Sequence, residues 1–423
     1  MNIKTIGLFG LLFLAYSCNK DSVVPVPSQG ANAILKDTHA LQQKSNLKIE
    51  GVYSVTSGSD KFGDQVIVKW NPTSLLPGHR SSLLIANSNG KHFIMDVGYL
   101  DSVVFIQGYW RDGYSDATGL CNMYISKTEG GTTLVTGYGD QKIIIRGAYG
   151  KESGLPDQTL TLEYARPLFS DTTKEFFILA HRCGGRNSDR LPVSENSIAM
   201  VKYTESLGTT GVELDPRISS DGVPFIYHDA DINIRLTQKG PLAGDVAAYT
   251  WYQLSNFVRL IHGEKIPSVE ELLMYVIDST SLKFVYLDMK SAEAVPAVIA
   301  VQKRAMDHAI IKNRNVLIVM GIPTTDVLNA LLEYPEYEKV PSLCELSIDE
   351  FKQAKSVVWA PRWTLGTQND LVEQVHNLNE KNLAVCWTID SPSWIADYIK
   401  NGQFNGLLTN YPYVEAYYHY IQE

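Results

Sequence analysis

The spacing of hydrophobic and polar residues changes once along this chain, near residue 170. Before that point, short apolar runs follow one another with no helical period between them. They occupy residues 51–55, 65–70, 82–86, 92–97 and 142–146, with hairpin-type turns at Asn89-Gly90 and Gly130-Gly131. Such spacing is typical of antiparallel strands joined by tight turns. We therefore expect an all-β domain over residues 48–166, built as a sandwich or a small barrel.

Beyond residue 175, apolar runs alternate with segments of helical period. The strand candidates are 176–180, 211–214, 284–287, 316–319, 342–346, 357–360, 383–387 and 406–409, and the helical segments include 194–207, 292–308, 325–332, 348–354, 370–379 and 393–401. Eight strands alternating with helices over roughly 250 residues are typical of a closed barrel. The prediction is an α/β protein whose residues 175–423 form a (β/α)8 TIM barrel. A doubly wound open sheet is the alternative.

The first 18 residues have the pattern of a targeting segment. Lys4 precedes an apolar stretch over 6–15 that is too short to span a bilayer, and Tyr16-Ser17-Cys18 follows. A small residue just before a cysteine resembles a bacterial lipoprotein cleavage box. We expect a signal peptide over 1–18 and lipidation at Cys18, with plain secretory cleavage nearby as the alternative. Residues 19–47 are polar and predict a linker.

These features predict an exported protein that is lipid-anchored to the bacterial cell envelope, on the periplasmic side or at the cell surface. The net charge of −9 and the absence of a long basic run argue against nucleic acid as the partner. The cysteines form no C-x-x-C pair, so neither a zinc site nor a thioredoxin-like site is indicated.

An aromatic group in the β-rich region has two interpretations. Tyr109, Trp110 and Tyr114 lie near Arg111. They could contact a carbohydrate or a lipid, or they could pack in the core of the domain.

Charged residues collect where the predicted strands end. Glu213 and Asp215 share one face of their strand end because side chains alternate with a period of two, and so do Asp288 and Lys290. His181-Arg182 and His228-Asp229 end two further apolar runs. Three carboxylates supply an all-oxygen site suited to a hard divalent cation, Ca²⁺ or Mg²⁺. The alternative is an inert salt-bridge cluster of these acids with Arg182, Arg217 and Lys290.

With these residues in place, the C-terminal part resembles the glycerophosphodiester phosphodiesterase family, a group of TIM-barrel phosphodiesterases. The resemblance runs in the family's order over the whole predicted barrel. The matching stretches lie at residues 180–182, 194–197, 213–215, 220–224, 228–229, 266–272, 287–290, 387–390 and 406–412.

The resemblance implies roles for individual residues. His181 and His228 match the acid–base pair, and we expect His181 to be the base and His228 the acid, with the assignment reversible. Glu213, Asp215 and Asp288 match the metal ligands. The phosphate is then expected to contact Arg182 and Lys290.

The chain also departs from the family's pattern. Asp288 stands where Glu is usual, Cys183 interrupts the string His-Arg-Gly-Gly, and Ser194 stands where Pro is common. Two further residues have open roles. Asn196 is expected either to cap a helix or to belong to the site, and Trp387 either to contact the glycerol or head group or to pack in the core.

The resulting prediction is metal-dependent hydrolysis of glycerophosphodiesters to glycerol 3-phosphate and an alcohol. The sequence leaves open whether a glycerol hydroxyl or water attacks first. Cleavage of another phospholipid head group, of the phosphoinositide type, is one alternative. A non-catalytic lipoprotein that binds a ligand at the surface is the other.

Overall fold

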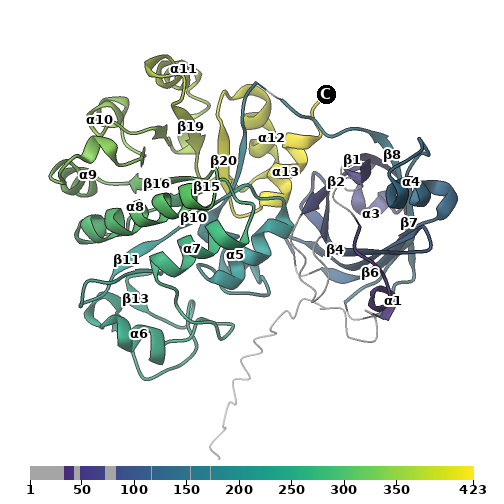
Figure 1. Cartoon of the computed structure of the whole chain (residues 1–423), viewed down its shortest axis with the longest axis horizontal. Coiled ribbons are helices and arrows are strands. Elements are labelled where there is room, and N and C mark those ends of the chain that lie inside the picture. The colour runs from purple at the N-terminus through teal and green to yellow at the C-terminus, as the bar shows by residue number, and fades with distance from the viewer. Residues whose placement is uncertain (1–32, 42–47, 72–81, 116, 153, 172) are drawn as a thin grey trace, which may run out of the picture.

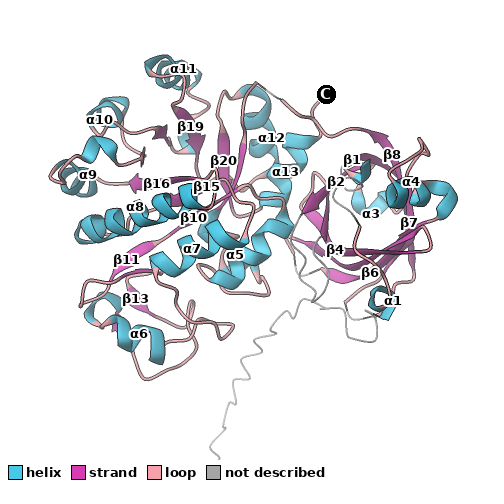
Figure 2. Cartoon of the chain, in the orientation of Figure 1, coloured by secondary structure: helices cyan, strands magenta, loops and turns pink. Residues whose placement is uncertain are grey.

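The computed structural model describes residues 33–41, 48–71, 82–115, 117–152, 154–171 and 173–423. Within them the chain forms two closed barrels, an antiparallel one followed by a parallel one. Figure 1 shows the barrels side by side, with the last helix, α13 (Pro412–Tyr420), lying between them. Figure 2 shows that strands dominate the first barrel, whereas helices surround the strands of the second.

The N-terminal barrel closes because its first and last strands pair with each other. Each strand is antiparallel to the next one along the chain, and β1 also pairs with β8. Its strands are β1 (Gly51–Ser57), β2 (Gln65–Asn71), β3 (Ser82–Ala86), β4 (Lys91–Leu100), β5 (Val103–Asp112), β6 (Thr118–Ile125), β7 (Ile144–Tyr149) and β8 (Gln158–Arg166). The barrel alternative of the sequence prediction is therefore correct, and the sandwich alternative is wrong.

Aromatic side chains fill the centre of this barrel. Phe62, at the end of the short helix α3 (Ser59–Phe62), packs against Phe93, Trp110 and Tyr149. Trp110 is 1% exposed, and its indole nitrogen donates to the Gly150 carbonyl oxygen at 2.8 Å. It therefore belongs to the core rather than to a ligand-binding surface.

The two predicted turns have different outcomes. The turn at Asn89-Gly90 joins β3 to β4 as expected, and Gly90 has a positive φ of 78°. Gly130 instead separates the 3-10 turn η1 (Lys127–Glu129) from the helix α4 (Gly131–Thr136), which Gly131 begins. Gly130 adopts φ 106°, a left-handed conformation that glycine tolerates where a helix begins or ends.

Part of the predicted linker is folded onto the barrel. The helix α1 (Ala33–Lys36) buries Leu35, and His39 forms an isolated antiparallel bridge with Tyr99 of β4. Apolar burial at Leu35 and Leu41 explains why residues 33–41 differ from a free tether. The predicted signal peptide over 1–18, with Cys18, and the rest of the 19–47 segment lie outside the described residues.

The second barrel consists of eight parallel strands, so the prediction of a (β/α)8 barrel is confirmed and the open sheet is wrong. The strands are β9 (Phe177–Ala180), β10 (Gly211–Leu214), β15 (Phe284–Leu287), β16 (Leu317–Ile322), β17 (Ser342–Cys344), β18 (Val358–Trp359), β19 (Leu383–Cys386) and β20 (Gly406–Thr409). They pair in this order, and β20 closes the circle on β9. Alternate residues, such as Phe177, Phe284 and Tyr286, form one buried cluster among the strands, while residues of opposite parity pack in the larger core that includes the helices.

Helices follow the strands around this barrel. They are α5 (Ile198–Thr204), α7 (Val269–Ser279), α8 (Val295–Ile311), α9 (Thr325–Leu332), α10 (Ile348–Gln353), α11 (Asn369–Leu378), α12 (Pro392–Asn401) and α13. Local sequence explains several of their starts. Ser268 and Ser347 form capping boxes with Glu271 and Glu350 at α7 and α10, and a proline begins α12.

The segment after β10 does not proceed directly to a barrel helix. It forms the hairpin of β11 (Pro216–Ile218) and β12 (Pro224–Ile226), a small pair of β13 (Asp231–Ile232) and β14 (Gly244–Asp245), and the helix α6 (Trp251–Phe257). His228 follows β12, which is not a barrel strand. His228 therefore follows an apolar strand, as expected, but it reaches the rim from this excursion and not from the end of a barrel strand.

The two barrels share a buried interface. The ring of His92 on β4 stacks on Tyr413 of α13 at 3.7 Å, and the hydroxyls of Tyr109 and Tyr203 lie 2.9 Å apart. Leu84 of β3 belongs to the same hydrophobic cluster as the helices of the second barrel. Tyr109 therefore packs between the two barrels. It lies neither at a carbohydrate-binding or lipid-binding surface nor in the centre of its own barrel.

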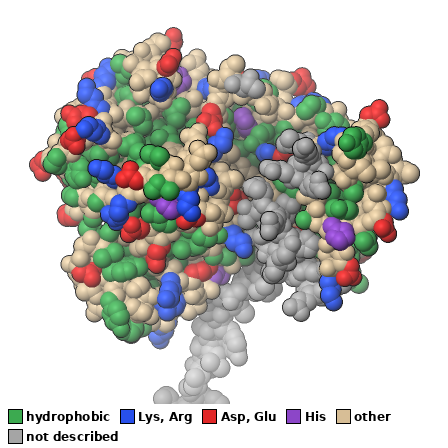
Figure 3. Space-filling model, in the orientation of Figure 1, with side chains coloured by type: hydrophobic (Ala, Val, Ile, Leu, Met, Phe, Trp, Pro, Cys, Tyr) green, Lys and Arg blue, Asp and Glu red, His purple; other side chains and the backbone are tan. Residues whose placement is uncertain are grey.

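The surface carries both signs of charge. In the view of Figure 3, acidic and basic side chains are intermixed rather than gathered into one basic patch. Among the described residues, no helix combines the length and apolar character needed to cross a bilayer.

Candidate active site

A polar cavity of about 600 Å³ opens at the carboxyl ends of the parallel strands. The backbone brings residues there from separate parts of the chain: His181 and Arg182 follow β9, Glu213 lies in β10, and Asp288 and Lys290 follow β15. His228 and Trp387 also line the cavity. Asp215 lies behind this wall, fully buried and in contact with Lys290. The structure therefore brings together all eight predicted catalytic, substrate-binding and metal-site residues.

Three carboxylates form a compact oxygen cluster. One oxygen from each of Glu213, Asp215 and Asp288 lies within 4.8 Å of the others. Glu213 Oε1 is buried and has no hydrogen-bond partner among the described residues. A buried, unpaired carboxylate oxygen is costly unless a cation or donor satisfies it. The donor set therefore fits a hard divalent cation, and these three residues could hold one.

The electrostatics of the cluster point the same way. Burial raises the pKa of Glu213 well above its usual value, and repulsion from Asp215 and Asp288 adds to the rise. Burial also acts to raise the pKa of Asp215, but Lys290, whose Nζ lies 2.7 Å from Asp215 Oδ1, outweighs it and holds that pKa below its usual value. Lys290 also pairs with Asp288. One ammonium does not balance three close carboxylates, so additional positive charge would be stabilising there.

His181 is held as a neutral ring. Its Nδ1 lies 2.8 Å from Asn410 Oδ1, and its Nε2 lies 3.9 Å from Glu213 Oε2. Because an amide oxygen only accepts, Nδ1 carries the proton and Nε2 keeps its lone pair. Burial, aided by the charge of Arg182, lowers the pKa of His181 to about 3. A neutral imidazole with a free nitrogen in the cavity is suited to accept a proton.

His228 has a different environment. Its Nδ1 lies 2.7 Å from Asp229 Oδ1, and its Nε2 lies 2.8 Å from the NH2 nitrogen of Arg182. A guanidinium only donates, so Nε2 accepts and Nδ1 donates to the carboxylate. Asp229 is itself held by Arg235 and Asn233. This carboxylate would balance the charge of a ring protonated on both nitrogens, which is the form that a general acid needs.

Arg182 connects the two histidine neighbourhoods. Its backbone nitrogen donates to Glu213 Oε2 at 2.6 Å, and its guanidinium donates to Glu195 Oε1 at 2.9 Å as well as to His228. Its φ of 51° lies in the left-handed region, where a non-glycine residue is strained. Glu195, 1% exposed, also pairs with Arg235. Sequence analysis did not single out Glu195 because its role depends on residues 13 and 40 positions away.

The structure distinguishes between the alternatives for Asn196, a helix cap or a site residue, and for Trp387, a substrate contact or a core residue. Ser197 is the N-cap of α5, so the helix begins later than predicted and Asn196 does not cap it. The amide of Asn196 donates to Asp215 instead. Trp387 lines the cavity while its indole nitrogen donates to the Ala360 carbonyl oxygen at 2.8 Å and its ring faces Arg362 at 5.0 Å. It therefore combines packing with a place in the cavity wall.

The inert-cluster alternative is observed only in part. Lys290 does pair with two of the acids, but Arg217 donates to the carbonyl oxygens of Tyr227 and His228.

Cys183 is fully buried, and burial raises the pKa of its thiol well above the usual value, so it is held protonated and unreactive. Among the described residues the four cysteines are free.

Two further polar residues that line the cavity, Tyr286 and Glu345, were not predicted from the sequence to belong to the site. Glu345 follows β17 and accepts a hydrogen bond from the hydroxyl of Tyr286, and both line the cavity. Burial, with the charge of Asp288, raises the pKa of Glu345 to about 8. The signal was present, since Glu345 stands near the end of an apolar run as Asp288 does, but no motif drew attention to it.

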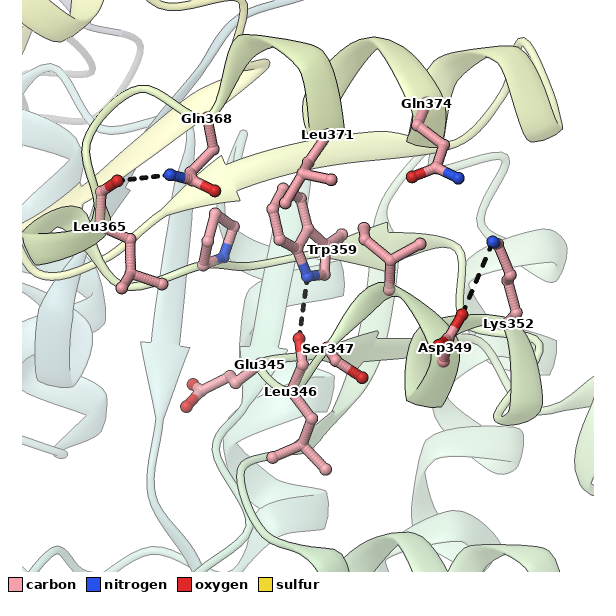
Figure 4. Close-up of a pocket in the computed structure, with 12 residues that line it drawn as sticks. Glu345, Leu346, Ser347, Asp349, Lys352, Trp359, Leu365, Gln368, Leu371 and Gln374 are labelled. Atoms are coloured by element: carbon pink, nitrogen blue, oxygen red, sulfur yellow. Dashed lines mark hydrogen bonds and ion pairs between the residues drawn. The ribbon is translucent and has the colours of Figure 1, made fainter.

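A second cavity, of about 560 Å³, lies beside the first and shares Glu345 with it (Figure 4). Figure 4 shows the contacts that Trp359, Gln368 and Lys352 make in its wall. Trp359 donates to the Leu346 carbonyl oxygen, Gln368 to that of Leu365, and Lys352 faces Asp349 at 3.8 Å. The histidines and the carboxylate cluster do not line this second cavity.

Comparison with known proteins adds family information to this geometry. A family model described as the glycerophosphoryl diester phosphodiesterase family matches residues 181–414, more than half of the chain. A Mycobacterium tuberculosis protein named probable glycerophosphodiester phosphodiesterase 2 is 33% identical over 130 residues, which are 31% of this chain and 44% of that protein. Human glycerophosphodiester phosphodiesterase 1 is 26% identical over 33% of this chain and 41% of its own length. The chain thus spans less than half the length of these curated relatives.

Solved structures are similar at low identity. A glycerophosphodiester phosphodiesterase from Parabacteroides distasonis has 19% identity and a TM-score of 0.45, covering 56% of this chain and 94% of that one. An Oleispira antarctica phosphodiesterase, solved with the product sn-glycerol-3-phosphate, has 18% identity and a TM-score of 0.44 over 56% of this chain and 94% of that one.

Proposed function

Because the chain belongs to the glycerophosphoryl diester phosphodiesterase family, we propose that it hydrolyses glycerophosphodiesters to glycerol 3-phosphate and an alcohol. The observation that carries this proposal is one cavity in which two imidazoles, an oxygen cluster and two cationic side chains meet. Hydrolysis of a phosphodiester needs a base for the nucleophile, an acid for the leaving oxygen and positive charge for the phosphate.

The histidines divide the proton transfers. His181 presents Nε2 without a proton to the cavity, where this nitrogen could take the proton of the attacking hydroxyl or water. His228, backed by Asp229, is suited to donate a proton to the leaving oxygen. Arg182 lies against His228 Nε2, so a phosphate beside His228 would contact the guanidinium as well.

Glu213, Asp215 and Asp288 would hold a divalent cation, Ca²⁺ or Mg²⁺. When bound, such an ion supplies charge stabilisation for phosphate oxygens. Lys290 contributes a second positive charge close to the same carboxylates and would face the phosphate.

The direct test is a substrate panel on the purified full-length chain. Glycerophosphocholine, -ethanolamine, -glycerol and -inositol are each incubated with Ca²⁺ or Mg²⁺, and release of glycerol 3-phosphate is measured. We expect turnover that EDTA abolishes and that His181→Ala lowers by at least about 100-fold. Cleavage of intact phospholipids in preference to the deacylated diesters would favour a head-group phosphodiesterase. Absence of turnover, with ligand binding retained in His181→Ala, would favour a binding protein.

We further propose that the chain is exported and lipid-anchored through Cys18, as its N-terminal pattern suggests. Metabolic labelling with a fatty-acid analogue is expected to mark the wild-type chain and to fail for Cys18→Ala. Labelling of both, or of neither, would count against the anchor.

A further inference from the structure

The N-terminal barrel touches the elements that hold His181, although the proposed chemistry assigns it no role. Its interior is filled by buried rings of Phe62, Trp110 and Tyr149. Small barrels packed in this way are solid cores rather than ligand carriers. The surface that faces the second barrel is therefore the part of this domain that can act on the site.

One side chain of this surface contacts the segment that follows β19 of the second barrel. Tyr114, in the loop between β5 and β6, donates its hydroxyl hydrogen to the backbone oxygen of Asp390 at 2.7 Å. Its ring lies 4.4 Å from that of Tyr411. On the other side, the Tyr114 ring packs against Gly90, where a Cβ would lie 2.5 Å from the ring and would displace it.

Asp390 is linked to His181 through Asn410. Its carboxylate accepts from the backbone nitrogen of Asn410 at 3.0 Å and from the Asn410 side-chain amide at 2.8 Å. The same Asn410 presents Oδ1 to His181 Nδ1 at 2.8 Å. Because Asp390 engages the NH2 group of the amide, the amide cannot flip without losing that bond, and its oxygen stays on the histidine.

Arg111 holds a second part of the same neighbourhood. Its guanidinium, on a side chain only 4% exposed, donates to the carbonyl oxygens of Asp189 and Arg190. Asp189 binds Arg186, whose NH1 nitrogen lies 3.8 Å from Asp390 Oδ2. Arg111 therefore holds the backbone at Asp189, whose side chain binds a neighbour of Asp390.

We propose that the β5–β6 loop of the N-terminal barrel is a positioning element for His181, with Tyr114 acting through Asp390 and Asn410. This proposal rests on the proposed function, in which Nε2 of His181 accepts a proton. The contacts keep the hydrogen on Nδ1 and the lone pair of Nε2 toward the cavity. Loss of Tyr114's hydrogen bond loosens the segment that orients Asn410, so the fraction of correctly oriented His181 falls.

The test compares two matched tyrosines in the full-length protein. Tyr114→Phe removes the bond to Asp390, whereas Tyr124→Phe changes a tyrosine of nearly equal exposure, 42% against 43%, on the outside of β6. We expect Tyr114→Phe to lower kcat about fivefold, the effect of one ordinary hydrogen bond, with KM unchanged. Tyr124→Phe is expected to keep the wild-type kcat. Thermal unfolding of both variants checks that the folded fraction is equal.

A double-mutant cycle separates positioning from general stability. Asn410→Ala alone is expected to lower kcat strongly, and adding Tyr114→Phe to it is expected to lower kcat no further. The proposal is overturned if the loss of kcat in the double variant equals the product of the two single losses. It is also overturned if Tyr114→Phe keeps the wild-type kcat, or if Tyr124→Phe loses as much kcat as Tyr114→Phe. In each of those cases the proposed function still holds if the wild type is active and His181→Ala is inactive. If the wild type has no hydrolase activity, both the proposed function and the positioning role of Tyr114 are wrong.

Discussion

At the scale of single residues, strain and buried charge occur at the same positions. Arg182, Cys183 and Asn196 have φ values of 51°, 71° and 58°, although none is glycine. This backbone aims the Arg182 nitrogen at Glu213 and the Asn196 amide at Asp215. Such conformations persist when surrounding bonds stabilise them, and they often accompany function. Glu213 and Asp215, which these groups hold in place, belong to the carboxylate cluster that additional positive charge would stabilise.

The first prediction concerns those carboxylates. Adding Ca²⁺ or Mg²⁺ to the EDTA-treated protein is expected to raise its Tm, because an ion that binds only the folded state stabilises it. Glu213→Gln is expected to weaken that binding at least about tenfold and to reduce the rise in Tm, since one oxygen ligand loses its charge. Calorimetry with and without metal measures both effects.

Asp349→Asn provides the matched control. Its carboxylate is exposed, on the wall of the second cavity, and lies outside the cluster. An identical metal response in wild type and Glu213→Gln would show that the cluster is not where the ion binds.

At the scale of elements, local sequence explains where many helices begin. Ser268 accepts from the Glu271 nitrogen at 3.1 Å, while Glu271 Oε2 accepts from the Ser268 nitrogen at 2.8 Å. Such boxes satisfy backbone donors that the first helical turn leaves free. The predicted start of α5 at Ser194 was wrong because Ser194 bonds Glu264, 70 residues away, and Ser197 caps the helix.

The second prediction tests a cap. Ser268→Ala is expected to lower the free energy of unfolding by about 1 kcal/mol, or roughly 1–2 °C in Tm. Ser391→Ala serves as the control, because Ser391 precedes α12 without a side-chain bond to its backbone. Equal losses in both variants would mean that serine at the helix start, rather than the box, stabilises the protein.

At the scale of the whole molecule, the two barrels behave as one packed body at their interface. His92 is 1% exposed against Tyr413, and burial, with the charge of Arg111, lowers its pKa to about 3. In the unfolded chain the ring titrates near its usual pKa of 6.5. Between these values the unfolded state binds the additional proton, so stability is complete above pH 6.5 and is lost as the pH falls toward 3.

The third prediction follows from that sign. Replacing His92 by Phe preserves the stacked ring and removes its titration. From pH 7.5 to 5.5 the wild type is expected to lose about 1 kcal/mol more stability than His92→Phe. Denaturant unfolding at both pH values measures the difference. Parallel losses in the two proteins would show that His92 is protonated in the folded state as readily as in the unfolded one.

The order and length of the apolar runs were enough to predict eight barrel strands and the residues that end them, because a strand buried on both faces needs a continuous apolar stretch. Residues near those ends, such as Glu213 and Asp288, could be grouped because parallel strands end at one rim. Contacts across long sequence separations could not be predicted from the apolar runs, and only the family resemblance placed His228 in the site. His228 reaches the cavity from a hairpin outside the barrel, Glu195 binds Arg182 and Arg235, and Tyr114 crosses from the other barrel to Asp390. Those positions depend on side-chain packing between distant segments, which leaves no periodic trace along the chain.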